Sequence, residues 1–278
     1  YNPNKLIKYG FKFYGLAGSD GMIYDILPSC GSTTFDRCNL TAVESSMGVG
    51  AKAVIALCKH IHNPEAAMVY FDNWFASVPL MSYLRFSTNI LSTGTIRKDR
   101  TQNCPFTDDK KFSKLPRGTS ESFVSSDAVV AVRWLDSKPV CLASTAAGIE
   151  PKTTVKRFEK AAKARVDFEC PRIIQLYNSH MGGVDLSDQY VAAHRVPTRS
   201  KRWYFPIIGY LVDLAVVNSY RQYCRDNKLL GIQQKDIDFA DAKAFRFSVS
   251  KSLCCLERQK DSPLCEEKAV EEFHIPPM

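Results

Sequence analysis

A short apolar run that ends in an aspartate constrains the fold of this chain more than any other stretch. Residues 68–71 read Met-Val-Tyr-Phe, the pattern of a strand buried on both faces of a sheet. Asp72 follows at once, and the sequence then predicts a helix over residues 77–86 and a strand over 90–95. With a helix also predicted over 47–62, this alternation indicates an α/β fold, a mixed sheet whose parallel members are covered by helices.

Asp72 is therefore predicted at the carboxyl end of a strand, the edge at which open α/β sheets bind ligands. A single aspartate there is also a common N-cap residue, so it indicates a site only together with a second carboxylate. Phosphoryl chemistry with two metals needs carboxylates from different elements, which hold Mg²⁺ ions about 3.5–4 Å apart.

A candidate for the second carboxylate follows the pair Gly182-Gly183, which gives the backbone the freedom for a sharp turn. The next residues read as a helix start, with Asp185 and Asp188 three positions apart and so on one helix face. This spacing suits a divalent cation, but it is equally that of a well-capped helix.

The other segments predict how the chain is divided. A hairpin is predicted over 6–27 with its turn at 18–21, a polar loop over 29–44, and a long helix over 205–224. Residues 173–177 fit a short helix or a strand. We expect a first core part at 1–96, a β-rich insertion at 97–172 closed by the basic segment 152–172, a second core part at 173–225 and a charged, irregular tail at 226–278.

Composition narrows the function classes. The 278 residues are 45% hydrophobic and 24% charged, which is ordinary for a globular protein, and the net charge of +8 permits a polyanionic partner. The ten cysteines lack a CxxC spacing, so we predict no zinc site and expect reduced thiols in the nucleus or cytosol.

The most apolar window, 205–217, is too short to span a bilayer, so no membrane partner is expected. The start at Tyr1, without a leader pattern, suggests missing upstream sequence and not secretion.

Several separate motifs, in order along about four-fifths of the chain, closely resemble the piggyBac transposase family, in particular its transposable-element-derived members. They are Tyr70-Phe71-Asp72-Asn73-Trp74-Phe75-Ala76-Ser77, Thr93-Gly94-Thr95-Ile96-Arg97-Lys98, Tyr177-Asn178, Gly182-Gly183-Val184-Asp185 and Lys201-Arg202-Trp203.

The resemblance implies an RNase H-like core of DDE type, a mixed sheet flanked by helices, with a β-rich insertion between the second and third acidic positions. It implies Mg²⁺-assisted DNA cleavage and strand transfer at TTAA sites in the nucleus. On this resemblance Asp72 and Asp185 are the second and third metal-binding catalytic residues, and Asp188 matches an accessory acidic position.

The first acidic position departs from the family pattern. The strand that should end in an aspartate reads Leu16-Ala17-Gly18-Ser19, so that Gly18 takes its place. Asp20, in the turn, and Asp25, on the neighbouring strand, are the nearest substitutes. Two residues along a strand span about 6.6–6.8 Å, which is large against Mg²⁺–oxygen bonds of about 2.0–2.1 Å.

Three basic segments, 97–100, 152–165 and 195–202, fit either solvated surfaces or phosphate contacts. Trp203 fits either DNA contact or helix packing, whereas Trp74 and Phe75 are expected in the core. The histidines lack a ligand-like cluster and are interpreted as structural. The predicted DNA-binding residues are Arg97, Lys98, Arg199, Lys201, Arg202 and Trp203.

Three functional hypotheses follow. The first is a transposase-derived protein that binds duplex DNA and whose catalysis is impaired at Gly18. The second is an active Mg²⁺-dependent cut-and-paste transposase acting at TTAA sites. The third is a domesticated module that contacts chromatin or proteins alone. A homodimer is left open by the sequence, as is any enzymatic activity.

Overall fold

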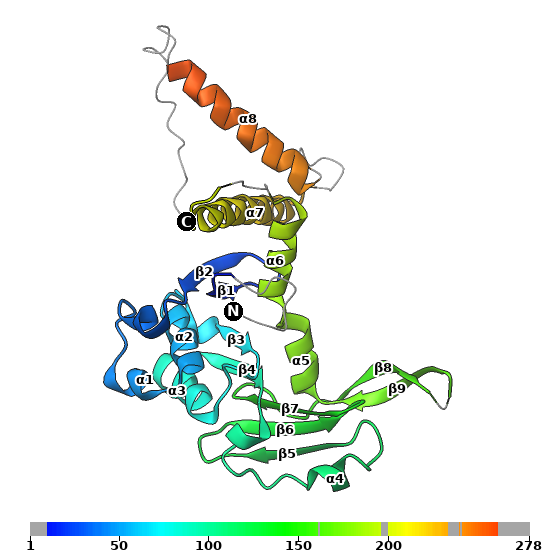
Figure 1. Ribbon diagram of the computed structural model, residues 1–278. Helices are drawn as coiled ribbons and strands as arrows, with labels where there is room; N and C mark the ends of the chain where they lie inside the picture. Colours follow the sequence, from blue (N-terminus) through cyan, green and yellow to red (C-terminus); the bar gives the residue numbers. More distant parts are fainter. Residues whose placement is uncertain (1–9, 161, 196–199, 233–238, 240, 261–278) are drawn as a thin grey trace. The chain divides into compact units, whose positions relative to one another are not determined.

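The computed structural model of the chain describes residues 10–160, 162–195, 200–232, 239 and 241–260 (Figure 1). It divides into two compact units, Tyr1–Leu186 and Ser187–Met278. Within the described residues, no helix combines the length and the apolar character that crossing a membrane requires.

A five-stranded mixed sheet forms the centre of the first unit, in the order β3-β4-β7-β6-β5. β3 (Met68–Phe71) and β4 (Leu91–Thr95) are parallel, with Phe71 opposite Gly94, whereas β4 and β7 are antiparallel. This confirms the mixed sheet with parallel members that the strand–helix–strand pattern predicts. The remaining strands of the sheet are β5 (Ser120–Val124), β6 (Val130–Leu135) and β7 (Pro139–Ser144).

Two antiparallel hairpins stand beside this sheet in the first unit. The predicted amino-terminal hairpin is confirmed as β1 (Phe13–Ala17) and β2 (Ile23–Pro28). The segment after Lys152, interpreted only as basic, forms a second hairpin from β8 (Thr153–Glu159) and β9 (Ala164–Cys170). Alternation along both strands would have indicated it, but the lysines and arginines obscured that pattern.

Helices α2 (Val49–Cys58) and α3 (Val78–Thr88) pack against the β3–β4 part of the sheet. Ser77 is the N-cap of α3 and accepts a hydrogen bond from the backbone N–H of Leu80, while Asn89 ends the helix in the left-handed conformation. Leu80, Met81 and Leu84 are fully buried in the core that these elements share. β3 itself is less buried than predicted: of its four residues only Phe71 is buried, so the strand is not covered on both faces.

The predicted loops contain short helices as well. The segment 29–44 holds a 3-10 turn (Gly31–Phe35) and leads into α1 (Ala42–Ser46), and the polar stretch 97–117 holds a 3-10 turn (Lys98–Arg100) and α4 (Asp109–Phe112). A further 3-10 turn spans Pro64–Ala66. α5 (Arg172–His180) resolves the alternative over 173–177 in favour of a helix.

α6 (Gly183–Ala193) begins at the second glycine of the predicted turn. In the second unit, α7 (Phe205–Leu229) confirms the long predicted helix and extends it at the carboxyl end. The expectation of an irregular tail after Asp226 was wrong, because α8 (Ala242–Lys260) follows. Arg246 on α8 is paired with the buried carboxylate of Asp213 on α7, so the charged residues of this tail take part in helix packing.

Candidate active site

Asp72 follows the last residue of β3 and is exposed. Its Oδ1 accepts a hydrogen bond of 2.8 Å from the backbone N–H of Trp74, which fixes the carboxylate against the start of its own loop. Its backbone carbonyl accepts from the N–H groups of Phe75 and Ala76, both at 3.2 Å. The aspartate therefore starts a tight, hydrogen-bonded turn at the sheet edge predicted to hold a site.

The side chain of Arg100, from a different segment of the chain, also holds this loop. Its Nη1 donates to the carbonyls of Asn73 and Trp74, each at 3.0 Å, and to that of Ala76 at 3.3 Å. The basic segment 97–100 was expected to lie on a solvated face or to contact phosphate, and the structure gives this member a different role. No sequence pattern predicted that Arg100 would bind this loop, because the carbonyl groups to which it donates come together only when the loop is folded.

Ring contacts join the motifs of the first unit. Tyr14 on β1 stacks on Trp74, with ring centroids 5.7 Å apart, and Trp74 and Phe75 pack into the core as predicted. Tyr70 on β3 stacks on His180 at the end of α5, with centroids 4.8 Å apart. These contacts join β1 to the loop after Asp72, and β3 to the end of α5.

Tyr177 on α5 lies close to these residues. The sequence identified it only as part of the motif Tyr177-Asn178. Burial raises the pKa of its hydroxyl, the hydrogen bond with Thr95 at the end of β4 lowers it, and the negative charge of Asp72 raises it. The hydroxyl is thus close enough to Asp72 to sense its charge, while it is held by the neighbouring strand.

The turn before Asp185 packs against the end of β1. Gly182 has a φ of +113°, and a Cβ on Gly183 would lie 2.2 Å from the carbonyl oxygen of Gly18, an impossible contact with backbone. Position 183 therefore has to be glycine for α6 to begin here. Asp185 is exposed in the first turn of α6, so the helix that carries the predicted third carboxylate starts beside the residue that replaces the first.

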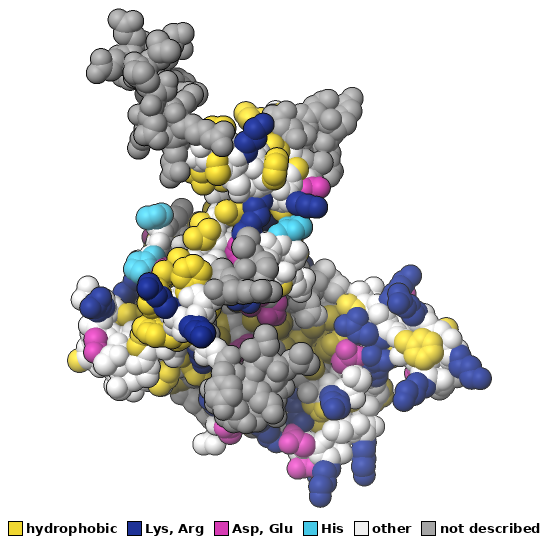
Figure 2. All heavy atoms as spheres, turned by 45° about the horizontal axis from the view of Figure 1, so that its top comes forward, with side chains coloured by type: hydrophobic (Ala, Val, Ile, Leu, Met, Phe, Trp, Pro, Cys, Tyr) yellow, Lys and Arg dark blue, Asp and Glu magenta, His cyan; other side chains and the backbone are white. Residues whose placement is uncertain are grey.

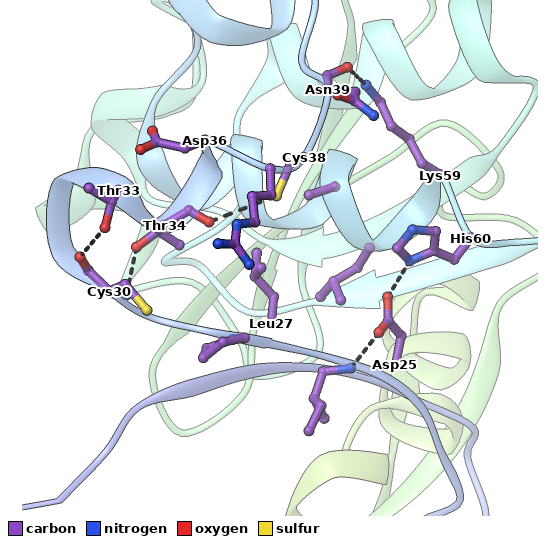
Figure 3. A pocket seen from close by; sticks show the side chains of 15 residues that line it. Asp25, Leu27, Cys30, Thr33, Thr34, Asp36, Cys38, Asn39, Lys59 and His60 are labelled. Carbon is purple, nitrogen blue, oxygen red and sulfur yellow. Dashed lines mark hydrogen bonds and ion pairs between the residues drawn. The ribbon is translucent and has the colours of Figure 1, made fainter.

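The two substitutes considered for the first carboxylate are engaged elsewhere. Asp20 Oδ1 accepts from the backbone N–H of Met22, at 3.2 Å, within the β1–β2 turn. Asp25 pairs with His60 at the end of α2 and lines a hollow of about 720 Å³ with it, as Figure 3 shows. Neither Asp72 nor Asp185 lines that hollow.

The donor set at this edge does not fit two metal ions. Gly18 provides no carboxylate, so of the three metal-binding positions that the resemblance implies only Asp72 and Asp185 are acidic. In the part of the chain that the structure describes, no three side chains of His, Cys, Asp or Glu gather closely enough to hold a metal ion. Asp188, the predicted accessory residue, lies one turn beyond Asp185 on the same face of α6 and belongs to the second unit.

The predicted DNA-binding residues fall in both units. Arg97 and Lys98 are exposed in the first unit, and Lys98 Nζ lies 3.0 Å from Asp109 Oδ1. Lys201, Arg202 and Trp203 are exposed in the second unit, Trp203 to 70%. Arg199 lies outside the described residues.

Comparison with known proteins places the chain in a family. Residues 1–220 match the family model described as Transposase IS4. The human PiggyBac transposable element-derived protein 2 is 33% identical over 228 residues, which are 80% of this chain and 37% of that protein. The human PiggyBac transposable element-derived protein 3 is 29% identical over 219 residues, which are 78% of this chain and 36% of that protein.

The fold agrees with a solved structure of the same kind. The cryo-EM structure of a piggyBac transposase synaptic complex with hairpin DNA superposes with a TM-score of 0.70 at 22% identity, covering 96% of this chain and 51% of that one. The mixed sheet with its helices accordingly has the RNase H-like fold of that structure. The chain belongs to the piggyBac transposase family, and it spans little more than a third of the two human relatives.

Proposed function

We propose that the chain is a transposase-derived domain that binds duplex DNA and whose own strand-cleavage chemistry is impaired. The proposal that strand cleavage is impaired rests on the identity of Gly18 and on the residues around it. This glycine stands at the end of β1, in contact with the backbone of Gly183, where the family pattern requires a carboxylate. Two-metal hydrolysis depends on carboxylates that hold both ions, and this position offers none.

The charge of the chain supports the proposal that it binds DNA. The net charge is +8, and predicted contact residues such as Arg97 and Lys201 are exposed. Solvent-exposed cations attract a duplex through its phosphates, largely without regard to sequence. The related solved structure is itself described as a complex with hairpin DNA. On the same family grounds, we propose the nucleus as the compartment and TTAA-containing DNA as the first duplex to test.

Duplex binding is tested with a fluorescently labelled TTAA-containing duplex and fluorescence anisotropy between about 50 and 200 mM salt. We expect binding that weakens steeply as salt rises, because released counterions drive it. The double variant Lys201→Ala/Arg202→Ala should bind more weakly and with a shallower salt slope. Lys110→Ala/Lys111→Ala, an equal charge change on exposed α4 side chains, serves as the matched control. No binding at low salt would contradict the DNA-binding proposal and favour a module that contacts proteins alone.

Impaired catalysis is tested on the same DNA in a nicking assay with Mg²⁺. We expect no nicking above that of the variant Asp72→Asn. Asp36→Asn, which neutralises an exposed aspartate outside the candidate site, controls for the change of charge. Mg²⁺-dependent nicking by the unaltered chain that is lost in Asp72→Asn and kept in Asp36→Asn would show an active transposase instead.

A further inference from the structure

The β8–β9 hairpin has one covered face and one open face. Cross-strand register pairs Val155 with Phe168 on the covered face, and Phe158 with Arg165 on the open one. Val155 packs into the buried cluster around Trp134, whereas every residue of the open face is exposed. Figure 1 shows the hairpin as a ribbon reaching beyond the five-stranded sheet.

The covered face fixes the hairpin to the sheet. Arg117 pairs with Asp136, and Arg157 Nε lies 3.1 Å from Asp136 Oδ2. The Arg117 Nη1 also donates to the backbone carbonyl of Phe158 at 3.1 Å, while its guanidinium lies 4.8 Å from the ring centroid of Phe168. The strand segment that carries Phe158 is thus held by its backbone, and its side chain points away from the anchor.

The open face ends in a group that we call the hairpin tip, formed by Phe158, Lys160, Lys163 and Arg165. The ring of Phe158 is 59% exposed although the residue lies within a strand. Among the described residues, none of the three cations has an ion-pair partner, whereas Lys152 at the base of the hairpin is paired with Glu169 at 2.9 Å. Figure 2 shows dark blue side chains surrounding a yellow patch at this end of the molecule.

A simpler role for lysines on a two-stranded hairpin is to prevent its exposed strand edges from pairing with a strand of another molecule. That role does not call for an exposed aromatic ring among them. An exposed ring flanked by unpaired cations matches instead the chemistry of unpaired nucleotides, whose bases stack on aromatic side chains while their phosphates contact lysine and arginine. In a duplex the bases already stack on one another and offer no free face.

We propose that the hairpin tip binds single-stranded DNA, with Phe158 stacking on an unpaired base and the three cations contacting the flanking phosphates. The inference rests on the proposed function, because it assigns one contact of a DNA-binding chain. It adds that this contact distinguishes unpaired from paired DNA, which the charge of the chain does not.

The test compares a labelled single strand of about 12 nucleotides with the duplex of the same sequence, using the whole chain and fluorescence anisotropy. Phe158→Ala should weaken single-strand binding by about 5- to 150-fold, the range for losing one stacked base, and leave duplex binding nearly unchanged. Phe158→Tyr keeps the ring and should bind like the parent chain. Phe158→Leu keeps apolar bulk without a π face and should bind like Phe158→Ala.

The cations are tested separately. Lys160→Ala/Lys163→Ala/Arg165→Ala should reduce the salt slope of single-strand binding by about 2, at about 0.7 for each phosphate that is no longer neutralised. The matched control removes three other exposed lysines of the first unit, Lys110, Lys111 and Lys138, and should change this slope less. Thermal melting followed by circular dichroism establishes that each variant folds.

The outcomes separate this proposal from the one it rests on. If the parent chain binds neither DNA at low salt, the proposed function fails. If it binds DNA but Phe158→Leu binds the single strand as tightly as the parent, only the hairpin-tip proposal is overturned. Binding of the parent to anionic phospholipid vesicles that Phe158→Ala abolishes, with DNA affinity unchanged, would assign the tip to a membrane surface and would equally overturn it.

Discussion

Glu44 is a buried carboxylate that joins three elements of the first unit. It closes the capping box of α1 with Thr41, it lies 2.8 Å from Lys59 Nζ just beyond α2, and its Oε1 accepts from the Tyr83 hydroxyl of α3 at 2.8 Å. Burial raises its pKa, but the hydrogen bonds from Lys59, from the backbone of Thr41 and from Tyr83 outweigh burial and lower it to about 2.

Because the folded pKa of Glu44 is depressed from 4.5, its contribution to stability is present above pH 4.5 and is lost as the pH falls towards 2. That shift corresponds to about 3 kcal/mol. We therefore expect Glu44→Gln to lower the free energy of unfolding by about 2–3 kcal/mol at pH 7 and by much less at pH 3. Urea denaturation at both values measures this, with the exposed Glu65→Gln as control. An equal loss at both values would contradict this account.

At the residue scale, the sequence identified candidate carboxylates for the site, but it did not indicate what surrounds them. Asp72 and Asp185 were identified from motifs, because motif residues are read directly from the chain. The contact of Gly183 with Gly18, and the hold of Arg100 on the loop after Asp72, join segments far apart in sequence. Such pairings depend on the tertiary fold, so no local pattern encodes them.

At the scale of the elements, one side chain makes several contacts to the β8–β9 hairpin. Arg117 holds both Asp136 and the carbonyl of Phe158, and its guanidinium covers Phe168. Hydrogen bonds to charged groups are worth about 1.5–3 kcal/mol each. The Arg117 guanidinium therefore contributes to the orientation of the hairpin tip, together with the pair of Arg157 with Asp136 and the packing of Val155.

We expect Arg117→Ala to increase amide hydrogen exchange across residues 153–170 and to leave exchange in β3 and β4 unchanged, because the hairpin opens locally. Hydrogen-exchange mass spectrometry measures this directly. Arg97→Ala, which removes an exposed arginine of the same unit, should change neither region. Unaltered exchange in the hairpin of Arg117→Ala would contradict this role, because the remaining contacts would then be sufficient to position it.

Prediction of whole elements succeeded best around the strand that precedes Asp72. The strand 68–71 was predicted with its observed bounds, and the helix after it with shifts of one and two residues at its ends. The helix before it was predicted over 47–62 and is shorter, at Val49–Cys58. Prediction failed for α1, which has five residues and depends on its capping box, and for α8, whose charged residues resemble an irregular tail. The capping box decides the structure of α1, and α8 is held by tertiary contacts such as the ion pair of Arg246 with Asp213. Neither contact can be read from a hydrophobic pattern.

At the scale of the whole molecule, family membership and fold agree, whereas activity does not follow from either. The chain spans 37% and 36% of the human relatives, so it represents one portion of such proteins. Within it, the elements that carry two acidic motifs are in place, and the element that should carry the first ends in glycine. This combination leads to the proposal of a DNA-binding domain that has lost its own cleavage chemistry.

The most direct test of that proposal restores the missing carboxylate and measures Mg²⁺ binding by calorimetry. Gly18 is not among the glycines with positive φ, so its backbone accepts an aspartate. We predict that Gly18→Asp binds Mg²⁺ at least about tenfold more tightly than the parent, a gain of about 1.4 kcal/mol. Gly18→Asn should show no gain, and Gly18→Asp/Asp72→Asn should lose it. Equal Mg²⁺ affinity in the parent and in Gly18→Asp would contradict the account, because position 18 would then not belong to the metal site.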